Sequence, residues 1–84
     1  MDFANVKLAL DPKAAKICDQ QAAVESDEVT RAVWQDLAIG FRDGTDCSRE
    51  SVRWLIQWSE TTWSDRTGTE ETRGEAAYLR RLYP

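Results

Sequence analysis

The chain has 84 residues, enough for one domain with a single small core but too few for two domains. Its formal net charge of −4 argues against a general nucleic-acid binder, because binding phosphates requires clustered lysine and arginine. No apolar run approaches the roughly 18 residues that span a membrane, and the N-terminus lacks a basic region followed by an apolar one. We therefore expect a single cytoplasmic domain, residues 1–84, without a membrane segment.

Tryptophan is the unusual part of the composition. Val, Ile, Leu and Phe together supply 16 residues, or 19% of the chain, a share close to that of disordered sequences. Four tryptophans offset this shortage, because each can bury on the order of 150–250 Å². The composition therefore predicts a folded domain.

The first ten residues fit two structures. Phe3, Val6 and Leu10 have helical spacing, whereas Val6, Leu8 and Leu10 alternate with more polar residues as in a strand. A strand here needs a partner, and the best candidate in the sequence is residues 78–83. We favour an N-terminal arm or short helix over a strand.

Two helices follow. Asp11 and Pro12 are a capping residue and a favourable first helical residue, so the first helix is expected over residues 12–24. A capping Ser26, followed by two acids, starts the second helix, expected over residues 27–43. Its predicted buried face repeats every four residues and is extended by a tryptophan and an alanine: Val29, Val33, Trp34, Leu37, Ala38 and Phe41.

The third helix, expected over residues 49–63 and capped by Ser48, carries three of the four tryptophans. Val52, Leu55, Ile56, Ser59 and Trp63 form one stripe, predicted to be core. Trp54 and Trp58 form a second stripe beside it. One neighbouring helix covers an arc of about 100°, so this wider apolar arc requires two neighbours or a neighbour and a binding partner.

A fourth helix is expected over residues 70–83, because Thr67 and Glu70 have the spacing of a capping box. Gly44, after the second helix, is expected to adopt the left-handed conformation of a helix C-cap. The connections are short, which favours antiparallel helices packed side by side. The predicted fold is therefore all-α, a small bundle of three to four helices.

The sequence offers little chemistry for catalysis. It contains no histidine, the commonest general acid or base and the commonest metal ligand. Cys18 and Cys47 have no metal-like spacing, and without an export signal we expect two reduced thiols. The glycines form no phosphate-binding pattern. We therefore expect a protein that is not an enzyme, with no catalytic residue, no metal site and no cofactor.

Charge is distributed unevenly along the chain. From Asp19 to Asp46, seven acids face only Arg31 and Arg42, a local balance of −5. From Ser48 onward, six acids meet six arginines. The acidic half could attract a basic partner, although a solvated helix surface is the simpler interpretation.

The leading hypothesis is an interaction protein that binds a larger protein, possibly a nucleic-acid-binding one, and modulates or inhibits its activity. Small acidic inhibitors carried by phages and mobile elements, such as anti-CRISPR and anti-restriction proteins, share this general character, although no residues here match one such family. The candidate partner-binding residues are Trp54, Trp58, Arg53, Asp27, Glu28 and Asp36. If the acids face a basic groove, binding should weaken in high salt and when Asp27, Glu28 and Asp36 are reversed in charge.

Two alternatives stay open. Arginines and aromatic residues of the third and fourth helices could enclose a nucleotide-like anion in an oligomeric module. The Trp54 and Trp58 stripe could instead join two copies of the chain as a homodimer. Tryptophan fluorescence during nucleotide titration would respond strongly only in the first case, and light scattering would detect the second.

Overall fold

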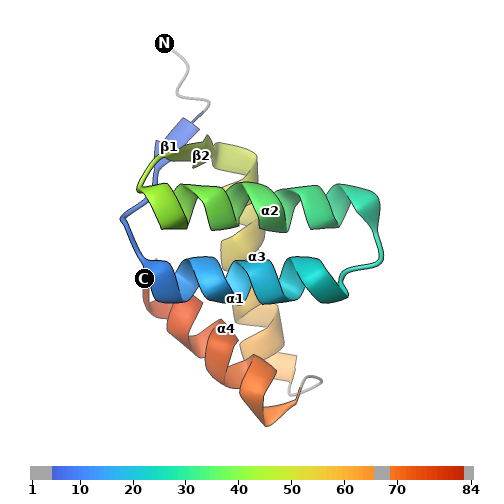
Figure 1. Cartoon of the computed structure of the whole chain (residues 1–84). Helices are drawn as coiled ribbons and strands as arrows, with labels where there is room; N and C mark the ends of the chain where they lie inside the picture. Colours follow the sequence, from blue (N-terminus) through green and yellow to red (C-terminus); the bar gives the residue numbers. More distant parts are fainter. Residues whose placement is uncertain (1–4, 66–68, 83–84) are drawn as a thin grey trace. The chain divides into compact units, whose positions relative to one another are not determined.

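The computed structural model describes residues 5–65 and 69–82. Over these residues the chain is all-α apart from one short sheet, with the elements in the order β1, α1, α2, β2, α3, α4 (Figure 1). The helices are α1 (Pro12–Val24), α2 (Glu28–Asp43), α3 (Arg49–Asp65) and α4 (Glu70–Leu82). Every helix bound lies within two residues of its predicted position, and the predicted fold class is confirmed. The chain divides into two compact units, residues 1–52 and 53–84, so α3 begins in the first unit and continues in the second.

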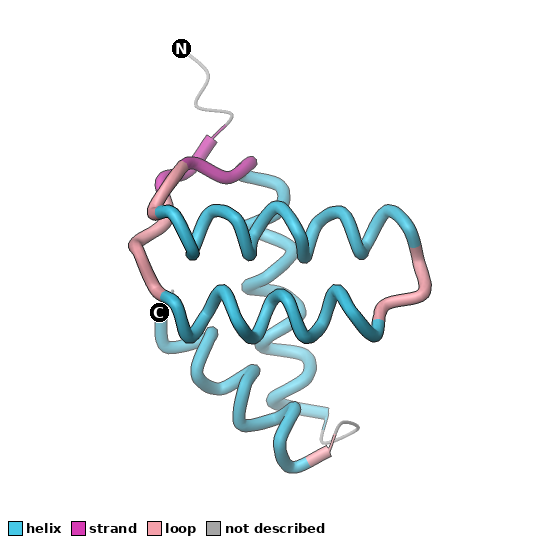
Figure 2. The backbone as a smooth tube through the Cα atoms, viewed as in Figure 1, coloured by secondary structure: helices cyan, strands magenta, loops and turns pink. Residues whose placement is uncertain are grey.

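In the first unit, α1 and α2 lie side by side and antiparallel, joined by a short loop (Figure 2). Asp11 caps α1 by accepting a hydrogen bond from the Ala14 N–H, and its own N–H donates to the Phe41 carbonyl near the end of α2. The buried apolar residues of the two helices supply most of the core: Ala14, Ala15, Ile17, Cys18, Ala22, Trp34, Leu37, Ala38 and Phe41. The loop and this core together fix the two helices as a pair.

The buried face of α2 is narrower than predicted. Trp34, Leu37 and Phe41 are buried, but Val29 is 75% exposed and Val33 only partly buried. Residues four apart advance by about 40° around an α-helix, so three such steps carry Val29 about 120° away from Phe41. A run of apolar residues at this spacing therefore leaves the core face at its N-terminal end.

The N-terminal segment is a strand, so the predicted arm or short helix is wrong. β1 (Asn5–Lys7) pairs antiparallel with β2 (Asp46–Ser48), with Val6 opposite Cys47. The Leu8 N–H extends the ladder by donating to the Thr45 carbonyl. The partner suggested from the sequence was also wrong, because residues 78–82 belong to α4. We call the β1–β2 pair and Leu8 the ribbon.

The helix ends follow their caps closely. Gly44 has a φ of 65° and closes α2 in the predicted left-handed conformation. Ser48 caps α3 as predicted, because its Oγ accepts from the Ser51 N–H at 3.1 Å. Asp27, and not Ser26, caps α2, and its carboxylate accepts from the Thr30 N–H.

For α4, the Thr69 Oγ1 accepts from the Thr72 N–H at 3.1 Å. This contact places the cap one residue before Glu70, so the helix begins where the sequence predicted. The predicted capping box involves Thr67, which lies outside the described residues.

The second unit holds the rest of α3 together with α4. Its buried side chains include Leu55, Ser59, Ala76 and Leu79, and the Ser59 Oγ donates to the Ile56 carbonyl at 2.8 Å. Trp63, predicted to be core, is 47% exposed. Helical periodicity predicts which face of α3 is buried, but it does not show how far along the helix burial extends.

Candidate protein-binding groove

A shallow groove of about 520 Å³ lies on one face of α2 and reaches the start of α3. Val29, Ala32 and Val33 line its middle, and Glu28 and Asp36 line it from α2 on either side of this apolar part. Residues spaced by three or four share one face of a helix, which is why these positions meet. Ser51 of α3 completes the lining. The groove therefore combines an apolar centre with two carboxylates.

The same face of α2 is closed farther along the helix. At Gly40 the side chain is absent, and a Cβ built there would lie 2.6 Å from Leu8 Cδ1 and 3.5 Å from the Cys47 Cβ. The ribbon therefore packs closely against α2 at this point. The contact at Gly40 is eleven residues after Val29, so the first turns of α2 extend beyond it, and Val29 is 75% exposed.

A polar cluster fixes the Asp36 end of the groove. Asp36 Oδ2 accepts hydrogen bonds from Cys47 Sγ at 3.0 Å and from Ser51 Oγ at 3.3 Å. Ser48 Oγ in turn donates to Ser51 Oγ at 2.8 Å. Two donors on one oxygen hold the carboxylate in a fixed orientation, and the other oxygen, Oδ1, accepts no hydrogen bond from the described residues. Asp36 is thus attached to the fold and exposed at the same time.

Neither cysteine in the structure behaves as a nucleophile. Burial, together with the Asp36 carboxylate, raises the pKa of Cys47 to about 12, and burial next to Asp19 raises that of Cys18 to about 12. Both thiols are free and buried. A nucleophilic cysteine requires a thiolate near neutral pH, so the Asp36–Cys47 contact is structural chemistry.

The opposite end of the groove follows a tightly bonded loop. Arg31 donates to the Glu25 carbonyl at 3.1 Å and to the Ser26 carbonyl at 3.4 Å. Glu25 accepts from the Asp27 N–H, and Asp27 accepts from the N–H and hydroxyl of Thr30. The first turn of α2, including Glu28, is therefore held in place before any partner binds.

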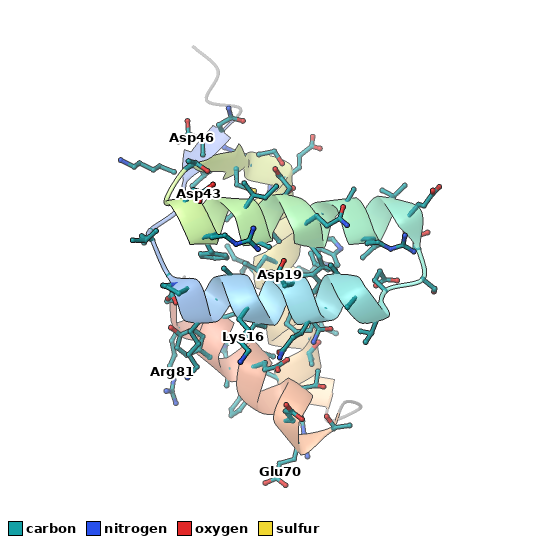
Figure 3. The ribbon with its side chains drawn as sticks, in the orientation of Figure 1. Lys16, Asp19, Asp43, Asp46, Glu70 and Arg81 are labelled. Atoms are coloured by element: carbon teal, nitrogen blue, oxygen red, sulfur yellow. The ribbon has the colours of Figure 1, made fainter. Side chains whose placement is uncertain are left out.

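Charge in the first unit is strongly one-sided. Arg42 pairs with Asp19 at 2.6 Å, and Asp19 lies between α1 and α2 (Figure 3). Arg31 is engaged by the loop carbonyls. The two arginines of this acidic stretch are therefore occupied within the unit, and Glu28 at the groove has no side-chain hydrogen bond or ion pair with the described residues. The groove presents negative charge to solvent.

Comparison of the chain with protein-family models, with curated proteins and with solved structures gives no match. Within residues 5–65 and 69–82, no three potential metal ligands come together, and no helix has the length and apolar character needed to cross a membrane. The site must therefore be interpreted from its own geometry.

The structure divides the predicted site residues between the two units. Glu28 and Asp36 line the same groove, and Asp27 is the cap beside Glu28. Arg53, Trp54 and Trp58 belong to the second unit, where Arg53 is exposed and both tryptophans are partly buried. Both indoles also interact with other residues. Their predicted role in binding a partner stays a prediction.

Sequence reasoning missed the apolar lining of the groove. Val29 and Val33 were assigned to the core, and Ala32 and Ser51 were not considered. The available signal was the 40° advance of residues four apart, which places Val29 next to Glu28 on a separate face. A second groove of about 410 Å³, with Asp19 and Arg31 among its lining residues, is already occupied in part by their intramolecular contacts.

Asp27 gives a prediction about pH. The Thr30 N–H and then the Thr30 hydroxyl hold the pKa of Asp27 below its ordinary value of 3.8. A carboxylate with a lowered pKa stabilises the fold above pH 3.8, and this contribution is lost as the pH falls through the lower, folded value. Carboxyl ¹³C NMR should show this lowered pKa. Between pH 5 and 2, Asp27→Asn should lose less stability than the wild-type protein, as measured by urea unfolding.

Thr30→Val is the matched control for that measurement, because it removes one donor and keeps the carboxylate. It should raise the pKa of Asp27 towards its ordinary value. An Asp27 pKa at or above 3.8 in the wild-type protein would contradict the observed cap.

Proposed function

We propose that this protein is a non-catalytic interaction module that binds a basic region of a larger protein through the α2 groove and modulates that protein's activity. The observation that carries the proposal is an apolar centre lying between two exposed carboxylates, Glu28 and Asp36. An apolar patch supplies affinity when it is covered, and flanking charges supply specificity and a faster approach. The fixed first turn of α2 and the anchored Asp36 lower the entropic cost of binding.

A nucleic-acid-binding protein is the partner class that we favour. Surfaces that bind phosphates are rich in lysine and arginine, and an acidic protein can occupy them in place of nucleic acid. An inhibitor of this kind, as phages and mobile elements carry, blocks its target by covering the basic surface. The two free, buried thiols support a reducing, cytoplasmic setting for this activity.

The structure also identifies the best residue for testing the proposal. Reversing Asp27 removes a helix cap, and reversing Asp36 breaks the contacts with Cys47 and Ser51, so both changes mix folding with binding. Glu28 is exposed and has no such role. Glu70 is its matched control, because both glutamates are exposed first residues of their helices.

The experiment immobilises the wild-type protein, Glu28→Lys and Glu70→Lys, and passes an extract of the native cells over each. We expect wild-type protein and Glu70→Lys to retain the same protein, and Glu28→Lys to retain at least about 10-fold less of it. The purified partner should then bind in solution, more weakly at high salt, and its own activity should change on saturation. Equal retention by all three proteins would contradict a role for the groove, and an unchanged partner activity would contradict modulation.

A further inference from the structure

We infer that the occupant of the groove is one face of a basic amphipathic helix, with apolar side chains over Val29, Ala32 and Val33 and a cation at each end, directed at Glu28 and Asp36. The inference rests on the proposed function and specifies the shape and charge of the partner. It follows from three features of the groove: the spacing of its acids, the chemistry of its lining and the state of the Asp36 carboxylate.

The spacing of the acids sets the spacing of the cations. Glu28 and Asp36 are eight residues apart on α2, which corresponds to about 12 Å along a helix. On a second helix lying along the groove, residues seven or eight apart span the same distance and share a face. Apolar residues three and four positions after the first cation then lie between the two, above Val29 and Val33.

The lining explains why the partner segment is a helix. The groove is formed by side chains of α2 and by Ser51, and the backbone N–H and C=O groups of an α-helix interior are bonded within the helix. A partner strand would therefore find no backbone groups to pair with at this surface. A helix satisfies its own backbone and offers only side chains, which is the mode that an apolar groove accommodates.

Asp36 completes the argument. Its Oδ2 is occupied by Cys47 and Ser51, while the exposed carboxylate keeps Oδ1 for an incoming donor. Because the carboxylate is already oriented, an ion pair formed with it loses less side-chain entropy than a pair with a freely rotating acid. Glu28, fully on the surface, provides the second and more adaptable contact.

The test uses a designed 18-residue helical peptide with Lys at positions 6 and 13 and Leu at positions 9 and 10. Amide chemical shifts of the ¹⁵N-labelled protein are followed during titration. We expect shifts confined to Glu28–Asp36 and around Ser51, with a Kd on the order of 10⁻⁵ to 10⁻⁴ M, because the contact is small. Replacing both lysines with Glu, or both leucines with Ser, should each weaken binding at least about 10-fold.

A charge exchange shows where each cation lies. Two peptides carry a single Lys→Glu change, one at position 6 and one at position 13. Against Glu28→Lys, one of them should regain most of the affinity lost against the wild-type protein, and which one does so gives the direction of the bound helix. Val29→Ser should weaken binding of the parent peptide several-fold, whereas Val24→Ser, which alters an equally exposed valine outside the groove, should not.

Four results would overturn the inference: no binding of the parent peptide at 1 mM, equal affinity for the Lys and Glu peptides, equal affinity for the Leu and Ser peptides, or shifts centred on Trp54 and Trp58. Shifts of groove residues that depend on protein concentration alone would also overturn it, because a second copy of the chain would then be the occupant. The proposed function fails separately. If a partner is retained through Glu28 but the peptides do not bind, the module stands and only the helical occupant is wrong.

Discussion

Trp34→Ala should lower the free energy of unfolding by about 3–5 kcal/mol, the usual effect of truncating a buried tryptophan. Trp34 is 1% exposed and lies on the same face of α2 as Leu37 and Phe41. Small domains are stable by about 5–15 kcal/mol in total, so this single change removes a large fraction of the stability. The thermal midpoint should fall by more than about 10 °C. Far-UV circular dichroism with heat and urea measures the effect without relying on the indole that is removed.

Trp63→Ala is the matched control. Trp63 is 47% exposed, and its removal should change the stability by less than about 1 kcal/mol. The sequence alone predicts the reverse for Trp63, which it places in the core. Equal destabilisation by both changes would mean that Trp63 is buried in solution and that the described end of α3 is wrong.

The helices were predictable because their signals are local. Asp11 with Pro12, Gly44 and Ser48 each act within a few residues of a helix end, and each occupies the expected place in the structure. The choice between Ser26 and Asp27 was wrong by one residue, because both side chains can cap a helix and the geometry of the loop decides between them.

The ribbon was not predictable from local pattern. β1 pairs with residues about 40 positions away, and β2 is three residues long between the cap of α2 and the cap of α3. A segment so short has no alternation of its own, and it was interpreted as part of a turn. Its role depends on the fold, because only the packed α2 offers Gly40 as a place for Leu8 to dock.

The candidate groove was predictable in part for the same reason. Glu28 and Asp36 were selected from charge, and helical geometry places them on one face. The apolar centre between them depends on where the ribbon stops covering α2, which no local signal reports. Val29 and Val33 therefore looked like core residues until the position of Leu8 was known.

Leu8→Ala should cost about 2–5 kcal/mol, as for other fully buried leucines, and should detach the ribbon from α2. Leu8 is 1% exposed, whereas Leu10 is 66% exposed, so Leu10→Ala is a matched control expected to lie within about 0.5 kcal/mol of the wild-type protein. A pair of three-residue strands is not stable alone, so its backbone hydrogen bonds should exchange faster once Leu8 is truncated. Urea unfolding and amide hydrogen exchange at Val6 and Cys47 measure the two effects.

The effect of Gly40→Ala should change sign with the residue at position 8. In the wild-type protein, removing a helical glycine gains about 0.5–1 kcal/mol, but the new Cβ lies 2.6 Å from Leu8 Cδ1 and forces a buried side chain to move, which typically costs 1–3 kcal/mol. With Leu8→Ala the obstructing atoms are gone, and the Cys47 Cβ at 3.5 Å is an ordinary contact. Gly40→Ala should therefore destabilise the wild-type protein and stabilise the Leu8→Ala variant, with a coupling of at least about 1 kcal/mol. The same sign in both backgrounds would mean that Leu8 does not pack against Gly40, and the ribbon would then no longer mark where the groove on α2 ends.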